Sequence, residues 1–216
     1  MSDRVLLADW PAPANIIAGT TTRHGDESDL PAEPSWLRQI HGDRAVMLGS
    51  SDFDGEEPEA DAVIGRRSGD LCVVRTADCL PVLLCAHDGS EIAAVHAGWR
   101  GLAAGVIDAA IARMATAPAE LLGWLGPAIE QSSFEVGGEV RDAFDAAGFD
   151  TAGRFDKNAA GRWQADLFGL AADRLQSIGV AAVYGERRCT YADPEQYFSY
   201  RRDGSTGRLL SFVYRR

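Results

Sequence analysis

The sequence predicts an α+β domain with mixed β-sheets, and three observations support this fold class. Short apolar runs typical of buried strands occur along most of the 216-residue chain. Amphipathic segments typical of helices lie among them, without the strict strand–helix alternation of a parallel α/β fold. The chain contains no tandem repeat, low-complexity tract or clear linker. We therefore expect one domain spanning residues 1–216, in keeping with the chain length.

The expected strands are rich in β-branched and other apolar residues. They lie at residues 15–23, 71–74, 81–85, 92–95, 121–125 and 180–184. Two polar segments between them, residues 24–35 and 50–60, are expected to be loops, and the second is acidic and exposed to solvent.

Three helices are expected, and residues that commonly end helices set their limits. The segments are 102–115, 138–147 and 165–178. The first ends before Pro118, and the other two stop at Gly148 and Gly179, because glycine commonly follows the last turn of a helix. At the end of the chain we expect a hairpin, with strands at 197–201 and 209–214 and a turn at Asp203-Gly204.

The composition excludes several classes of function. The formal net charge of −11 argues against non-specific nucleic-acid binding and against an anionic membrane surface, because both need basic patches. Small anionic substrates remain compatible with the sequence, because local arginines can override the global charge. No apolar run approaches the roughly 20 residues of a membrane span. The apolar core of the N-terminus is also too short for a secretory signal.

The four cysteines lack the close spacing of a disulfide framework. A reducing cytoplasm therefore fits the chain best. Cys72 and Cys85 lie inside apolar runs and are expected to be buried hydrophobic residues. The sequence does not indicate an oligomeric state.

Three residues have the chemistry of a metal site and lie where expected strands end. His96 follows an apolar run and precedes Gly98, where a helix is expected to start. His41 precedes Gly42, and Cys79 precedes Pro81. Two imidazoles and one thiolate can hold zinc with an open fourth position, as in catalytic zinc sites. Each histidine alone could instead be structural, and Cys79 could simply be buried.

Motifs distributed along nearly the whole chain resemble one family, the YfiH-type or laccase-domain family. The motifs are Gln39-Ile40-His41-Gly42, Thr76-Ala77-Asp78-Cys79-Leu80-Pro81-Val82, His96-Ala97-Gly98-Trp99-Arg100-Gly101, Leu125-Gly126-Pro127-Ala128-Ile129, Phe134-Glu135-Val136-Gly137, Cys189-Thr190, Phe198-Ser199-Tyr200-Arg201-Arg202-Asp203-Gly204 and Thr206-Gly207-Arg208. Several motifs in a fixed order are much more specific than any one of them.

The resemblance implies a layered α/β/β/α sandwich with mixed sheets and flanking helices. It also implies a purine nucleoside phosphorylase that acts on adenosine, inosine and methylthioadenosine, with phosphate as co-substrate and adenosine deamination as a side activity. The implied metal ligands are His41, Cys79 and His96. The mixed thiolate–imidazole set favours zinc. Copper is less favoured, because four histidines are too few for a multicopper oxidase.

Cys79, Asp78 and Arg100 are the candidate catalytic residues. Asp78 is expected either to orient a metal ligand or to act as a general base. Arg100 follows His96 by four residues and is expected either to anchor a phosphate or to pair with an acidic side chain. Arg23, Arg201 and Arg202 are further candidates for anchoring a phosphate.

Two other functional classes stay open. In one, Cys79 is a metal-free nucleophile with His41 or His96 as its base, in a hydrolase or amidase acting on a peptidoglycan precursor, as the family's peptidoglycan-editing name implies. In the other, the protein binds metal without turnover.

One segment departs from the family pattern. Family members follow Thr-Thr-Arg with Gly-Gly-Val-Ser and a longer, helix-bearing stretch, whereas here Thr21-Thr22-Arg23 runs into His24 and soon reaches Trp36. We expect the metal site to survive this shortening and nucleoside phosphorolysis to be weakened.

Overall fold

Two β-sheets packed face to face form the centre of the molecule. The computed structural model describes residues 3–216. The larger sheet has the order β12 (Ala182–Tyr184), β8 (Leu121–Leu125), β6 (Leu80–Ala86), β7 (Ile92–Ala97), β4 (Ala62–Gly65) and β3 (Ala45–Met47). It is mixed, because β12 pairs in parallel with β8 and β3 with β4, while the other pairs are antiparallel.

The second sheet is antiparallel and joins the two ends of the chain. Its order is β1 (Val5–Leu7), β2 (Ile16–Thr21), β13 (Leu209–Arg215) and β5 (Leu71–Thr76). A third, small sheet consists of β10 (Phe155–Lys157), β11 (Trp163–Ala165) and β9 (Glu135–Val136). The α+β class with mixed and layered sheets is confirmed.

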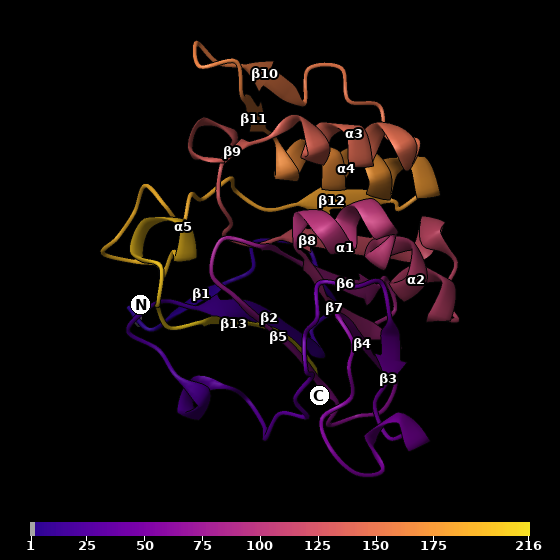
Figure 1. The fold of residues 1–216 in the computed structure, drawn as a ribbon. Helices are drawn as coiled ribbons and strands as arrows, with labels where there is room; N and C mark the ends of the chain where they lie inside the picture. The colour runs from indigo at the N-terminus through magenta and orange to yellow at the C-terminus, as the bar shows by residue number, and fades with distance from the viewer. Residues whose placement is uncertain (1–2) are drawn as a thin grey trace.

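Helices cover the face of the six-stranded sheet that points away from the four-stranded sheet (Figure 1). They are α1 (Trp99–Ala104), α2 (Val106–Arg113), α3 (Gly138–Ala146) and α4 (Leu167–Ile178). The strands of this sheet are buried on both faces, so they read as nearly continuous apolar runs. In β6, Val82 and Leu84 pack toward the helices, whereas Leu83 and Cys85 pack toward the other sheet.

The outer face of the four-stranded sheet has a thinner cover. Its buried residues, among them Val73 and Phe212, contact Leu30 and Trp36 from the segment that precedes β3. This segment contains only a short 3-10 helix, η1 (Glu27–Asp29). The acidic loop contains a similar short helix, η2 (Ser51–Phe53). Both segments are therefore connections, as expected, with one turn of local structure each.

The helix predicted at 102–115 is wrong in its limits and continuity. Helix starts already at Trp99, and Gly105 separates α1 from α2 by adopting φ 95°, in the left-handed region. That conformation suits glycine and interrupts the helix. The other two helices match closely, and the Asp166 side chain caps α4 by accepting a hydrogen bond from Gly169 N at 2.9 Å.

The predicted C-terminal hairpin is also wrong. Residues Tyr200–Asp203 form a short helix, α5, which Ser199 caps through a hydrogen bond from Arg202 N. β13 pairs with β2 and β5, strands far away in the sequence. Local turn chemistry at Asp203-Gly204 suggested a hairpin, but the long-range partners of β13 determine the pairing. No helix within residues 3–216 has both the length and the apolar character that crossing a bilayer requires.

The two-sheet core predicts how strongly one leucine contributes to stability. Leu83 is fully buried between the sheets, whereas Leu7 is 63% exposed on the edge strand β1. We expect Leu83→Ala to lower the free energy of unfolding by about 2–5 kcal/mol, because it removes buried contacts and leaves a cavity. The same change at Leu7 should stay within about 0.5 kcal/mol. Urea unfolding of both variants checks this, and equal effects would contradict the assigned core.

Candidate functional site

The strand register places two of the three candidate ligands, Cys79 and His96, together at one end of β7. In the β6–β7 pair, Pro81 lies opposite His96, so Cys79 falls beside Gly98. In the β4–β7 pair, Ala62 lies opposite Val95, and the His96 N–H donates to the Asp61 carbonyl at 2.7 Å. Cys79 belongs to the turn in which the chain leaves β5 of one sheet and enters β6 of the other. The site therefore lies where the chain crosses between the two sheets.

His41, Cys79 and His96 converge from separate segments, as predicted. One ligand atom from each lies within 4.8 Å of the others. Cys79 Sγ lies 3.8 Å from His41 Nε2. The two imidazole rings meet edge to face, with their centroids 4.8 Å apart. His96 is buried, Cys79 is partly exposed and His41 is exposed, so the group opens to solvent on the His41 side.

A buried carboxylate, Asp61, organises this group. Its side chain accepts hydrogen bonds from the backbone N–H groups of Ile40, His41 and Gly42 at 3.2, 3.0 and 2.8 Å. It also bonds to His96 Nδ1 at 2.7 Å. Nδ1 is thereby engaged, which leaves Nε2 of His96 as the nitrogen available to a metal. One carboxylate thus holds both the His41 loop and the His96 ring.

The proximity of these groups shifts their pKa values. Burial opposes ionisation of the Cys79 thiol, but hydrogen bonds and charges from His41 and His96 outweigh it and lower the pKa of Cys79 to about 6. Burial likewise opposes charge on His96, but Asp61 and Cys79 raise its pKa to about 9. Burial also disfavours ionised Asp61, yet its bonds from His96 and the backbone keep its pKa below the ordinary value. The metal-free site therefore favours a thiolate beside an imidazolium.

Backbone strain is concentrated at this site. Within residues 3–216, the non-glycine residues with positive φ are His41 at 60° and Asp78 at 91°. Such conformations are costly for L-residues and persist where surrounding contacts hold them. Each residue has such contacts: Asp61 binds the amide of His41, and the side chain of Asp78 is itself hydrogen-bonded.

Two glycines allow the close approach of the segments that carry the ligands. A Cβ at Gly98 would lie 2.9 Å from Cys79 Sγ and 3.1 Å from His41 Cδ2. A Cβ at Gly101 would lie 2.7 Å from the Gly42 carbonyl oxygen. These contacts explain why glycine flanks Trp99 and Arg100 in the motif.

A cavity of about 860 Å³ opens beside the three ligands. Its apolar wall includes Trp99, Ile129, Phe134 and Leu167. Its charged lining is mainly basic, with five arginines against the two acidic residues Glu57 and Asp78, although the whole chain carries a charge of −11. The cavity is therefore a locally basic site with an apolar wall, suited to a small anionic or aromatic ligand.

Asp78 lies in the cavity lining, but both oxygens of its side chain are engaged. Oδ1 accepts a hydrogen bond from Thr190 Oγ1 at 2.6 Å, and Oδ2 accepts one from the Arg201 N–H at 2.7 Å. Its own carbonyl accepts from Ile129 N at 3.0 Å. Asp78 thus ties the 190–201 segment to the Cys79 turn. This geometry favours orientation over general-base chemistry.

The four predicted arginines occupy different environments. Arg100 and Arg201 line the cavity. Arg202 donates to the carbonyls of Thr190, Tyr191 and Tyr197 and pairs with Asp203. Arg23 binds the Pro194 carbonyl and lies over the Phe198 ring. Arg202 and Arg23 therefore stabilise the C-terminal segment and are absent from the cavity lining.

Gln39 has a role that its motif did not reveal. Its side-chain amide donates to the Arg75 carbonyl and accepts from the Arg75 N–H, both at 2.8 Å. The amide thus imitates a neighbouring strand at the edge of β5 and joins the His41 loop to the strand that leads to Cys79.

The remaining cysteines lie away from the three ligands. All four cysteines are free. Burial raises the pKa of Cys72 well above its ordinary value and that of Cys85 to about 12, so both are inert, as expected. Cys189 is buried near Glu130 N and Ser133 Oγ.

Comparisons with known proteins give consistent results. The family model described as multi-copper polyphenol oxidoreductase laccase matches residues 14–216. A purine nucleoside phosphorylase of Escherichia coli is 38% identical over 242 positions, covering 98% of each chain. One from Pseudomonas aeruginosa is 42% identical over 239 positions, covering 97% of each. A solved structure from Neisseria meningitidis is 38% identical, covers 98% of this chain and 99% of that one, and superposes with a TM-score of 0.89.

The alignment lengths show that this chain is shorter than its relatives. The alignment with the Escherichia coli relative spans 242 positions, whereas this chain has 216 residues. The relative therefore carries internal residues that this chain lacks.

The lowered pKa of Cys79 predicts its reactivity. In metal-free protein, the rate of alkylation by iodoacetamide should rise with pH around a midpoint of about 6, because the thiolate is the nucleophile. Mass spectrometry of the labelled peptides measures this rate, with buried Cys72 and Cys85 as unreactive internal controls. A midpoint near the ordinary value of about 8.5 would contradict the thiolate–imidazolium assignment.

Proposed function

The chain belongs to the multi-copper polyphenol oxidoreductase laccase family, also named for YfiH, and is an enzyme of that family; from this premise we propose that it is a zinc-dependent purine nucleoside phosphorylase. One observation carries the proposal: a three-ligand group of the kind that holds catalytic zinc opens into a cavity with an apolar wall and a basic lining. Relatives at 38% and 42% identity that bear the name purine nucleoside phosphorylase support it.

The proposed phosphorolysis replaces the bond between the ribose and the purine with a bond between the ribose and phosphate. The bond between C1′ of the ribose and the purine nitrogen breaks, and the base leaves with the electron pair and takes up a proton. A phosphate oxygen forms the new bond to C1′, which gives ribose 1-phosphate. Trp99 and Phe134 in the cavity wall are suited to packing against a purine ring. Arg100 keeps its predicted role of holding the phosphate.

The residues fit zinc better than copper. His41, Cys79 and His96 form a mixed imidazole–thiolate set, and the bond from Asp61 to His96 Nδ1 supplies the orienting partner that metal-bound histidines commonly have. A zinc ion held there would act as a Lewis acid and lower the pKa of a coordinated water towards about 7. We propose adenosine deamination as the side activity of this group, and adenosine, inosine and methylthioadenosine as the nucleosides.

A second candidate function rests on the metal-free geometry. Cys79 Sγ lies 3.8 Å from His41 Nε2, and the pKa of Cys79 is lowered to about 6. A nucleophilic cysteine with a neighbouring histidine suits a hydrolase or amidase acting on a peptidoglycan precursor. Full activity that requires zinc and resists alkylation would exclude this alternative.

Two further expectations belong to the proposal. The ligands lie outside the shortened segment, residues 24–35, so the metal site should be intact while phosphorolysis is weaker than in longer relatives. Four free cysteines support a reducing cytoplasm as the compartment.

Product analysis tests the proposed reaction. Purified zinc-loaded protein is incubated with adenosine, with and without phosphate. Phosphorolysis should give adenine and ribose 1-phosphate only when phosphate is present, whereas deamination should give inosine in both samples. Cys79→Ser should lose zinc and both activities, and metal analysis checks the first loss. Neither product at high enzyme concentration would overturn the proposal, and wild-type zinc content in Cys79→Ser would remove Cys79 from the metal site.

A further inference from the structure

The five arginines of the cavity differ in whether a carboxylate neutralises them. Arg38 pairs with Glu59 at 3.0 Å. Arg75 lies 3.4 Å from Glu57 and also donates to the Leu37 carbonyl. These two side chains therefore contribute little net charge to the cavity.

The other three arginines have no carboxylate partner within residues 3–216. Arg208 turns back on its own segment and donates to the carbonyls of Thr206 and Gly207, both at 3.0 Å. Arg100 and Arg201 instead lie over aromatic rings of the cavity wall. The Arg100 guanidinium is 4.3 Å from the Trp99 ring centroid, and that of Arg201 is 5.4 Å from the Phe134 centroid.

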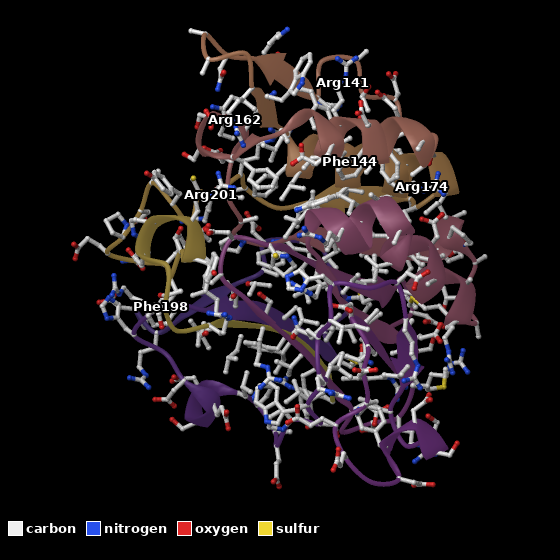
Figure 2. The ribbon with its side chains drawn as sticks, viewed as in Figure 1. Arg141, Phe144, Arg162, Arg174, Phe198 and Arg201 are labelled. Atoms are coloured by element: carbon white, nitrogen blue, oxygen red, sulfur yellow. The ribbon has the colours of Figure 1, made fainter. Side chains whose placement is uncertain are left out.

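Stacking leaves the edges of a guanidinium free to bind a ligand. A guanidinium carries five N–H donors in one plane, and an aromatic ring against its face occupies none of them. Arg201 uses Nη1 for the Glu135 carbonyl at 2.9 Å, and Arg100 makes no hydrogen bond or ion pair to the described part of the chain. In Figure 2, Arg201 lies between α5 and the segment that leads to β9.

The backbone ties both residues to the three-ligand group. Arg100 is four residues after His96, and Gly98 between them packs against Cys79. The Arg201 N–H donates to Asp78, the neighbour of Cys79. The backbone of each arginine is therefore tied to the same turn and strand end that carry Cys79 and His96, and the ring contacts with Trp99 and Phe134 orient the guanidinium groups.

We propose that Arg100 and Arg201 together form a subsite for a tetrahedral oxyanion beside the His41–Cys79–His96 group, and that Arg38, Arg75 and Arg208 lie outside it. Two uncompensated guanidinium groups match the charge and the several acceptor oxygens of a phosphate. The inference rests on the proposed function for its substrate, but the subsite itself is defined by charge and geometry. The oxyanion is either inorganic phosphate or the phosphate group of a nucleotide.

Binding of inorganic phosphate to the zinc-loaded full-length protein, measured by calorimetry without nucleoside, is the test. Arg100→Gln and Arg201→Gln should each weaken phosphate binding by at least about tenfold, because each removes a charge-assisted hydrogen bond. Arg38→Gln and Arg208→Gln are matched controls from the same cavity and should stay within about twofold. Circular dichroism confirms that each variant is folded.

Several outcomes distinguish this inference from the proposed function. Loss of phosphate binding in the two stacked arginine variants alone supports the subsite, even if the wild-type protein cleaves no nucleoside. Failure of the wild type to bind phosphate, or equal weakening in the two control variants, would overturn it. Where phosphorolysis is measurable, the KM for phosphate should rise in Arg201→Gln while the KM for adenosine changes little; a rise confined to adenosine would also overturn it.

A competition arm identifies the source of the oxyanion. If free phosphate is the ligand, adenosine should leave phosphate binding intact or strengthen it. If the ligand is a nucleotide, adenosine 5′-monophosphate should displace phosphate, and this displacement should require Arg100 and Arg201. Displacement of phosphate by adenosine alone would place the base in the subsite and contradict the assignment.

Discussion

The buried carboxylate of Asp61 is the interaction on which the site depends. An ionised carboxylate taken out of water is costly unless hydrogen bonds replace its hydration. Asp61 is fully buried and accepts three backbone N–H groups and His96 Nδ1. These four bonds join a loop to the end of β7. If His41 moves away from His96, a buried charge loses donors, so the separation of the two ligands is energetically constrained.

A second buried carboxylate works on the other side of Cys79. Asp78 accepts from Thr190 and from the Arg201 backbone, and so fixes the C-terminal wall of the cavity to the Cys79 turn. Within residues 3–216, the two non-glycine residues with positive φ are His41, whose amide binds Asp61, and Asp78 itself. The hydrogen bonds of both carboxylates thus hold a strained backbone, which keeps the His41–Cys79–His96 group and the cavity wall in one arrangement.

The sequence predicted that His41, Cys79 and His96 converge, and it located the central strands, but it did not reveal the groups that orient the three side chains. His41, Cys79 and His96 stood at strand ends and in family motifs, so their convergence could be predicted. Asp61 could not, because it lies one residue beyond segment 50–60, which was expected to be an acidic, exposed loop, and nothing local sets it apart from the acidic residues there. Its importance depends on the register of β4 against β7, a pairing between segments about thirty residues apart. The one signal was the apolar run Ala62–Gly65 that follows it, which indicates a buried strand.

Failed predictions of secondary structure have the same origin. Apolar periodicity alone predicts one continuous helix, which Gly105 divides into α1 and α2. β13 does not pair across the turn at Asp203-Gly204, because it forms longer ladders with β2 and β5. Local signals therefore located the longer strands and two of the helices, but they missed the short strands β1, β3, β4, β9, β10 and β11 and did not reveal which strands pair. Partners are set by which faces are buried together, and that is decided by the whole fold.

The zinc affinity of Asp61→Asn tests the central claim most directly. In this variant the side-chain N–H₂ is a donor, and it would face backbone N–H groups from which the Asp61 carboxylate now accepts hydrogen bonds. We therefore predict that zinc affinity falls by about 10–100-fold while the protein stays folded. Asp70→Asn is the matched control, because Asp70 also accepts two backbone N–H groups, from Arg66 and Arg67, in a turn outside the site. Its zinc affinity should equal that of the wild type. Unchanged zinc affinity in folded Asp61→Asn, or an equal loss in Asp70→Asn, would contradict the account.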